Sequence, residues 1–222
     1  LKGASGNGKV VLIYADTEQS PTAAYAIAGA ISNGTISWGT AVELSDEEAG
    51  HGDIIYDSVN DQFIAYVSGS SWGEFYTIWV TSTNTINKAI ADFSGDTTDH
   101  YNERGKITLE GNGKGVFWVQ DSVNFKVYPI VFSYSNQSAI TNQLDKNSFN
   151  YIEGVVPASP QENSTTKISG WDVVYLPDQD AYLTWYSQRG SGAYGGYKVR
   201  RKLRLSKRDA TSSDSKFLIT YQ

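Results

Sequence analysis

Three acidic residues, Asp53, Glu110 and Asp172, lie in or beside apolar segments that have the composition of buried strands. A pair of carboxyl groups, one acting as acid and one as base or nucleophile, is the usual requirement for hydrolysing a glycosidic bond. Asp53 and Asp172, however, begin two copies of one pattern, DIIYDSVNDQFIAYVS and DVVYLPDQDAYLTWYS. Because a structural role at the start of a strand explains residues of a repeat, we predict no catalytic residue. We expect that the chain is not an enzyme, with a glycosidase as the alternative.

Other motifs that carry chemistry are absent from the sequence. It has no cysteine, no nucleophile-elbow serine motif and no HExxH. GNGK occurs at 6–9 and 111–114, but both copies lie in predicted two-strand turns and lack the spacing of a phosphate-binding loop. His51 and His100 precede predicted inner strands in consecutive units, and with nearby Asp53 and Asp99 they could hold a metal. Repeats also duplicate loop residues without a function, so we expect no metal and no cofactor.

Aromatic residues in glycine-rich loops are the first candidates for ligand binding. Trp72, Tyr194 and Tyr197 are flanked by Gly and Ser. Flat rings held by such loops suit stacking on a sugar or on a partner protein. Rings in this position also serve simply to cover the end of a sheet.

A basic strip, KVRRKLRLSKR at 198–208, is the second candidate, and it contrasts with the net charge of −6 of the whole chain. Alternate residues of a strand share one face. One face of this strand therefore carries Lys198, Arg200, Lys202 and Arg204, and the other carries Val199, Leu203 and Leu205. The row of like charges would suit a polyanion, such as surface polysaccharide, lipopolysaccharide phosphate or nucleic acid, or an acidic neighbouring subunit. The alternative is a solvated face that protects a sheet edge from unwanted pairing.

The elements that carry these residues form an internal repeat. Short apolar runs centred on an aromatic residue recur at steps of 52, 52 and 67 residues, around Tyr14, Tyr66, Trp118 and Trp185. Each run lies in a group of predicted strands, such as DIIYD, QFIAYVS, FYTIWVTST and INKAIADF in the second unit. The units cover approximately 1–48, 49–97, 98–144 and 166–222, with a polar inserted loop at 145–165. The first unit shows no inner strand before GNGKVVLIYAD.

Four strands repeating at about 50 residues are typical of a blade of a β-propeller. One thin twisted sheet cannot cover both its faces, and packing blades around an axis buries face against face. We therefore predict an all-β propeller of four-stranded antiparallel blades, about four in this chain, with each central aromatic lying between neighbouring blades. The alternative is a sandwich of two antiparallel sheets. A chain of 222 residues that lacks Met is expected to be a processed protein or a segment of a longer one, and the blades could belong to a larger ring.

The connections between blades and the loops from second to third strand emerge at one end of a propeller. These are residues 49–53, 97–103, 169–172, 68–75 and 187–197. We expect any ligand at this end.

The run ISNGTISWGTAVELS at 31–45, followed by IIYDSVNDQF, resembles propeller-like repeats of phage tail and virion proteins. The resemblance covers two units well and the others loosely, and its motifs are structural. WD-repeat and sialidase propellers are not supported. The single WD begins an inner strand, and SSWGEFYTIW lacks the Asp of the sialidase box.

The resemblance implies a non-catalytic tail or tail-fibre component, located in the virion or outside the cell. Its expected partners are other tail subunits and host-surface polysaccharide, within a homo-oligomer. A secreted lectin-type or glycoside-hydrolase propeller is the alternative. Membrane insertion is not expected, because no apolar run approaches the roughly 18 residues that a spanning helix needs.

Overall fold

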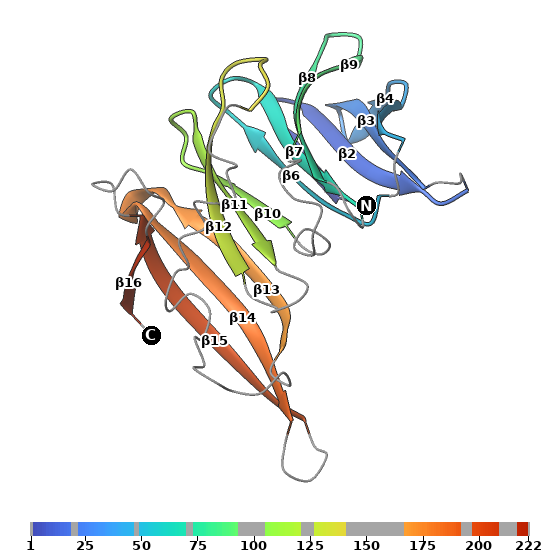
Figure 1. Cartoon of the computed structure of the whole chain (residues 1–222). Coiled ribbons are helices and arrows are strands. Elements are labelled where there is room, and N and C mark those ends of the chain that lie inside the picture. The colour runs from blue at the N-terminus through green and yellow to red at the C-terminus, as the bar shows by residue number, and fades with distance from the viewer. Residues whose placement is uncertain are drawn as a thin grey trace.

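The structure is a computed structural model. It describes residues 2–18, 22–46, 49–69, 73–92, 105–120, 127–140, 167–191, 197–208 and 217–221. Within these ranges the regular elements are β-strands, apart from one 3-10 turn at Pro177–Gln179. The strands form four separate antiparallel sheets that follow one another in an arc (Figure 1). The described part contains no helix with the length and apolarity needed to cross a membrane.

Each sheet is built from strands that are consecutive in the chain, and we name the sheets the first to fourth blade. The first blade contains β1 (Lys2–Gly6), β2 (Lys9–Asp16), β3 (Ala23–Ser32), β4 (Thr35–Trp38) and β5 (Val42–Ser45). The second contains β6 (His51–Asp57), β7 (Gln62–Ser68), β8 (Gly73–Val80) and β9 (Ile86–Asp92). The third contains β10 (Gly105–Leu109), β11 (Lys114–Gln120) and β12 (Val127–Ser133). The fourth contains β13 (Lys167–Leu176), β14 (Ala181–Ser191), β15 (Tyr197–Arg208) and β16 (Phe217–Tyr221).

The predicted all-β architecture of separate antiparallel blades is confirmed, and the two-sheet sandwich is wrong. The first strand of each blade is its inner strand, and the inner strands contact one another in the order β1, β6, β10, β13. The first blade is complete, so the prediction that it lacks an inner strand is wrong. Its inner strand β1, KGASG, has no large apolar residue and was therefore not recognisable from composition.

Apolar side chains join each blade to the next one in the chain. We call the sheet face toward the following blade the forward face, and the opposite one the rear face. Val11 and Ile13 of the first blade share one buried core with Phe63 and Ala65 of the second. In the second blade, the forward residue Tyr66 packs against Phe117 of the third, with ring centroids 4.3 Å apart. Each interface therefore uses alternate residues of the second strand of a blade.

The third and fourth blades repeat this contact. Trp118 is fully buried and its ring centroid lies 5.3 Å from that of Tyr182. Its indole N–H donates to the Thr108 hydroxyl over 3.1 Å, and this hydroxyl donates to the Val116 carbonyl. The buried polar group of the tryptophan is thus satisfied within its own blade.

Tyr14 does not occupy the position predicted for it. In the first blade the forward residue is Ile13, which is 4% exposed, whereas Tyr14 lies on the rear face and stacks on Tyr25. Successive side chains of a strand point to opposite faces, so an alignment shifted by one residue places the wrong side chain in the interface. The residue of the first blade that corresponds to Tyr66 of the second blade is therefore Ile13.

Two glycines let the inner strands approach their neighbours closely. A Cβ on Gly105 would lie 2.3 Å from the Phe117 ring and 3.0 Å from the Tyr66 ring. A Cβ on Gly52 would lie 2.8 Å from the Tyr66 carbonyl oxygen. Any larger residue would push β10 or β6 away from the aromatic contacts between the second and third blades.

The hairpins that join the inner to the second strand are closed by a repeated Tyr–Asp hydrogen bond. Tyr56 donates to Asp61 over 2.9 Å in the second blade, and Tyr175 donates to Asp180 over 2.8 Å in the fourth. Both aspartates have positive φ, 49° and 45°. The polar residues in the middle of the repeated pattern therefore build the turn.

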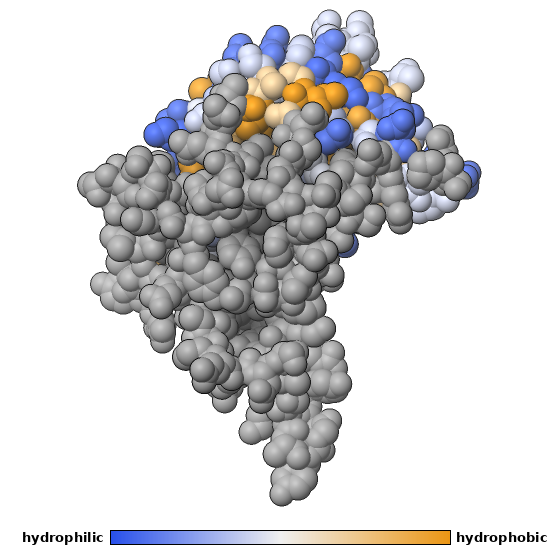
Figure 2. Space-filling view, in the orientation of Figure 1, coloured by the Kyte–Doolittle hydropathy of each residue, from blue (hydrophilic) through white to orange (hydrophobic). Residues whose placement is uncertain are grey.

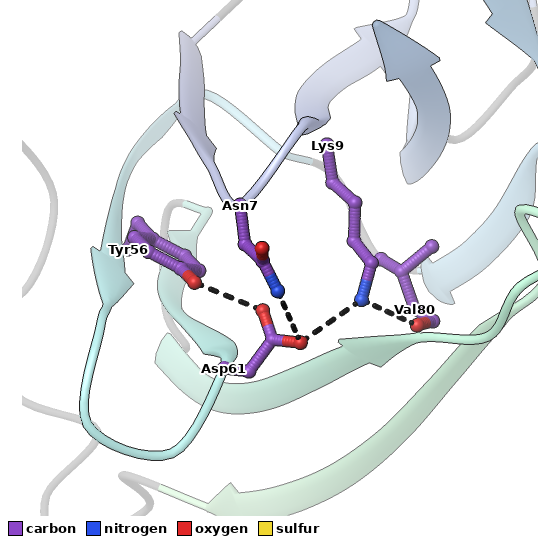
Figure 3. A network of polar contacts seen from close by, with 5 residues as sticks. All are labelled: Asn7, Lys9, Tyr56, Asp61 and Val80. Atoms are coloured by element: carbon purple, nitrogen blue, oxygen red, sulfur yellow. Dashed lines mark hydrogen bonds and ion pairs between the residues drawn. The ribbon is translucent and has the colours of Figure 1, made fainter.

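Asp61 of the second blade also binds side chains of the first blade (Figure 3). Asp61 accepts hydrogen bonds from Asn7 over 3.0 Å and from Lys9 over 3.2 Å, and Lys9 also donates to the Val80 carbonyl. Burial works against ionisation of Asp61, but its bonds with Tyr56, Asn7 and Lys9 outweigh this and lower its pKa. Burial and the bond to Asp61 raise the pKa of Tyr56 to about 12.

We predict that Asp61→Ala lowers the free energy of unfolding by roughly 1–2 kcal/mol, because it removes hydrogen bonds both within the hairpin and between blades. Partial exposure of the carboxylate keeps the loss in this range. The matched variant Asp180→Ala removes the hairpin bond to Tyr175 in the fourth blade and should cost less. Urea unfolding of both variants measures the difference, and equal losses would contradict a role of Asp61 between blades.

Candidate functional site at the start of the inner strands

A pocket of about 400 Å³ opens where the inner strands begin. Lys2, His51 and Gly105 are the first residues of β1, β6 and β10, and all three line it. The remaining lining residues are Ile13, Tyr14, Ala15, Ala24, Ala49, Gly50, Gly52, Val67, Lys106 and Trp171. The volume lies in the range of sites for small ligands. The pocket lies at the end where the sequence predicted a ligand, and segments 49–53 and 169–172 contribute to it.

Charged residues of alternating sign surround the axis next to this pocket. Each sits on an inner strand, opposite the forward residue of its own blade. The pairs are Lys2 with Ile13, Asp53 with Tyr66, Lys106 with Trp118, and Asp172 with Trp185. The four blades thus present Lys, Asp, Lys and Asp in turn, so Asp53 and Lys106 each lie between two charges of opposite sign.

Asp53 is the most perturbed member of this ring. Burial raises its pKa, although the backbone N–H of Ile107, which donates to it over 2.9 Å, and the charges of Lys106 and Lys2 act in the opposite direction. Desolvation disfavours the charged form of a carboxyl group, and here it is the dominant cause. Asp53 is therefore a half-buried acid that holds its proton more strongly than an exposed aspartate.

Asp172 has a different environment. Its carboxylate forms an ion pair with Lys106 at 3.2 Å, and its side chain is 40% exposed. Lys106 thus lies beside both acidic residues of the ring. Asp53 and Asp172 therefore lie next to the pocket in unlike surroundings, and neither of them lines it.

The walls of the pocket combine rings with hydrogen-bond donors. Trp171 is half-buried, whereas the ring of Tyr14 lies on the rear face of the first blade, stacked on Tyr25. Lys2 and Lys106 offer ammonium groups. Aromatic surface with a few polar groups is the usual composition of a site for a small polar ligand such as a sugar.

The structure places His51 at this pocket, where it is exposed and lies opposite Ser68. His100 lies outside the described residues. Among those residues no group of three His, Cys, Asp or Glu side chains could hold a metal ion. The proposed pairing of the two histidines is therefore not tested.

The predicted ligand-binding aromatics and basic strip are only partly described. Trp72 and Tyr194 lie outside the described residues. Tyr197 begins β15 opposite Ser191. The four basic positions follow on the same strand and pair with residues of β14. The pairs are Lys198 with Gly190, Arg200 with Gln188, Lys202 with Tyr186, and Arg204 with Thr184. Their role in binding stays a prediction. On the alternate positions Leu203 is 61% exposed and Leu205 is half-buried.

Glu110, the third acidic residue considered for hydrolysis, lies away from the pocket. It follows the last residue of β10, whereas Gly105 and Lys106 at the start of that strand line the pocket. Tyr182 donates a hydrogen bond to it. Glu110 therefore joins the third blade to the fourth.

Lys2 and Lys106 were not predicted as site residues, and Trp171 was predicted only as part of the segment 169–172. The signal was present, because Lys2 and Lys106 occupy the same register position as Asp53 and Asp172. A comparison that looked for identical residues could not find it, since the sign of the charge alternates from blade to blade.

No known family and no curated protein matches the sequence. Among solved structures, the S164A mutant of levansucrase from Bacillus subtilis superposes with a TM-score of 0.52 and 10% identity, over 98% of this chain and 67% of its own. The α-L-arabinofuranosidase PaAbf62A from Podospora anserina, in complex with cellotriose, superposes with a TM-score of 0.47 and 13% identity, over 94% of this chain and 63% of its own. A protein from Lactobacillus plantarum superposes with a TM-score of 0.40 and 9% identity, over 99% of this chain and 83% of its own.

The superposition on levansucrase establishes the fold, and the chain is a β-propeller. We expected that the chain is not an enzyme, because the acidic residues of the repeat have a structural explanation. The superposition corrects this expectation, because levansucrase, which has this fold, is an enzyme. The resemblance to phage tail and virion proteins holds only at the level of the propeller, and no comparison supports its finer part.

The raised pKa of Asp53 predicts a pH dependence. Between the ordinary pKa of 3.8 and the raised one, the folded state binds more protons than the unfolded state, so the free energy of unfolding falls as pH rises through this window. Asp53→Asn keeps an oxygen to accept from Ile107 and removes this contribution. The variant should therefore gain stability relative to the unmodified protein between about pH 4 and pH 7. Urea unfolding at both pH values measures the difference, and a constant difference would contradict the burial of a protonatable Asp53.

Proposed function

We propose that the chain is a carbohydrate-active propeller that binds a saccharide in the pocket at the start of its inner strands. One observation carries the proposal. The pocket brings Trp171 together with Lys2, His51 and Lys106, from four blades, at one place on the axis. The fold shared with levansucrase supports it, because that enzyme is named for its carbohydrate substrate. Host-surface polysaccharide, expected as a partner from the sequence, belongs to the same ligand class.

The chemistry of the pocket suits a sugar. The apolar face of a pyranose or furanose ring can pack on Trp171, while its hydroxyl groups accept hydrogen bonds from the ammonium groups of Lys2 and Lys106. Gly50 is exposed and Gly52 half-buried at the wall, where a ligand can approach the backbone closely.

Hydrolysis is the second candidate function, and the two unlike carboxyl groups favour it. Asp53, whose raised pKa keeps its proton more readily, would donate that proton to the oxygen of the glycosidic bond as the bond to the anomeric carbon breaks. Asp172, paired with Lys106, would accept a proton from the attacking water. The hydroxyl of this water then bonds to the anomeric carbon.

Binding is tested on a glycan array followed by calorimetry on the glycans that are captured. We expect Trp171→Ala to weaken binding at least about tenfold, a loss of roughly 1.4 kcal/mol. Val59→Ala is the matched control, because Val59 is an exposed apolar residue in the hairpin turn at the opposite end of the second blade. Capture of no glycan, or equal weakening by both variants, would contradict the proposal.

Hydrolysis is tested on the glycans that bind. Release of reducing ends should be lost in Asp53→Asn while the affinity of the variant stays within about twofold of the original. Binding without any release of reducing ends would leave the saccharide site in place and reject the hydrolytic role of Asp53 and Asp172.

A further inference from the structure

The described wall of the pocket at the start of the inner strands carries basic side chains and no carboxyl group. Its basic residues are Lys2, His51 and Lys106, from the first, second and third blades. Asp53 and Asp172 lie on inner strands next to the pocket, but neither is among the described residues that line it. A ligand that enters the pocket therefore meets positive charge at its wall.

Three adjacent inner strands hold these basic residues together. β1 and β10 both contact β6. Lys2 and His51 begin β1 and β6, and Lys106 is the second residue of β10. In Figure 2 hydrophobic residues gather in the middle of the described surface, with hydrophilic residues around them. Apolar contact is thus offered elsewhere on the molecule, whereas the pocket is distinguished by its cations.

Lys2 is the lysine of this wall that can bind a new anion. Lys2 is exposed, and no ion pair or hydrogen bond joins its side chain to another residue in the part of the chain that the structure describes. Asp53 acts on Lys2 through its charge, but this carboxyl group accepts its hydrogen bond from the backbone N–H of Ile107. Lys106, in contrast, is already paired with Asp172 at 3.2 Å.

The polar side chains of the wall mainly donate hydrogen bonds. A lysine ammonium group has three donors and no acceptor, and an indole N–H only donates. Lys2, Lys106 and Trp171 are of these two kinds. A sugar hydroxyl both donates and accepts, whereas an ionised acidic group only accepts, and its charge strengthens each bond from an ammonium group. The wall therefore suits an acidic group on the ligand better than a further hydroxyl group.

We propose that the pocket prefers an acidic saccharide, one that carries a carboxylate, a sulfate ester or a phosphate ester, and that Lys2 binds this acidic group. The inference rests on the proposed saccharide site and names the class of sugar that this site selects. The sugar ring packs on Trp171 while its acidic group lies against Lys2. The net charge of the whole chain is −6, so general attraction would not favour such a ligand and the preference arises locally.

Pairs of glycans that differ only in the acidic group test the preference by calorimetry. Glucuronate and galacturonate oligosaccharides are compared with the same chains after reduction of the carboxyl group to hydroxymethyl. Oligosaccharides with 6-sulfate or 6-phosphate esters are compared with the same chains after removal of the ester. We expect one kind of acidic glycan to bind at least about tenfold more tightly than its neutral parent. This ratio should fall as salt is added, because ions screen the attraction.

Lys2→Gln tests the residue that makes the preference. The amide keeps a hydrogen-bond donor but has no charge, so the ratio of the two affinities should fall to about twofold or less. Affinity for the neutral parent should stay within about twofold of the original, which verifies that the pocket of the variant is intact. Lys114→Gln is the matched control and should keep the full ratio. Lys114 is an exposed lysine that begins β11, at the end of the third blade away from Gly105.

The outcomes separate this inference from the proposed function. Neutral parents that bind as tightly as every acidic form would overturn the preference and leave the saccharide site standing. An equal fall of the ratio in Lys2→Gln and Lys114→Gln would also overturn it, because the preference would then not belong to the pocket. Binding of no glycan of either kind would reject the saccharide site and this inference with it.

Discussion

The structure depends on one constraint, that a four-stranded sheet has two faces and cannot bury either one alone. Each of the first three blades buries its forward face by placing an aromatic or aliphatic side chain of its second strand against the following blade. Tyr66 against Phe117 and Trp118 against Tyr182 are two instances of one contact. Because fully burying such a side chain is worth about 1.5–3 kcal/mol, these contacts hold the arc together. They also decide which residues reach the axis.

The candidate site is a consequence of this packing. The inner strands lie close together because Gly52 and Gly105 leave room for the Tyr66 backbone and the Phe117 ring. Side chains opposite the forward residues then converge on the axis, where Lys106 lies between Asp53 and Asp172. Charges so close together are tolerated because their signs alternate from blade to blade. The same arrangement gives the two acids different partners, the Ile107 backbone N–H for Asp53 and the Lys106 ammonium group for Asp172.

The repeat predicted the all-β blades and most of their strands, because alternation of apolar residues and turn residues are local signals. It failed where the signal was weak or ambiguous. β1 was missed because KGASG contains no large apolar side chain, and Tyr14 was placed in an interface that Ile13 occupies because a shift of one residue exchanges the two faces. The pocket lies at the end where the loops were expected to carry a ligand, and the binding of a ligand there stays a prediction. Its members Lys2 and Lys106 were not predicted, since their proximity to Asp53 arises only from the packing of three blades.

The Tyr–Asp hydrogen bonds at the hairpin turns join residues only five positions apart, Tyr56 with Asp61 and Tyr175 with Asp180. Such short-range closure costs little chain entropy, so each hairpin can form early and independently, before the neighbouring blade is in place. A chain organised in this way behaves as a nearly one-dimensional array in which a blade is influenced by its two neighbours and hardly by more distant ones. Sequence drift in one blade can then be absorbed locally, which gives such repeats freedom to diverge while the arc as a whole persists.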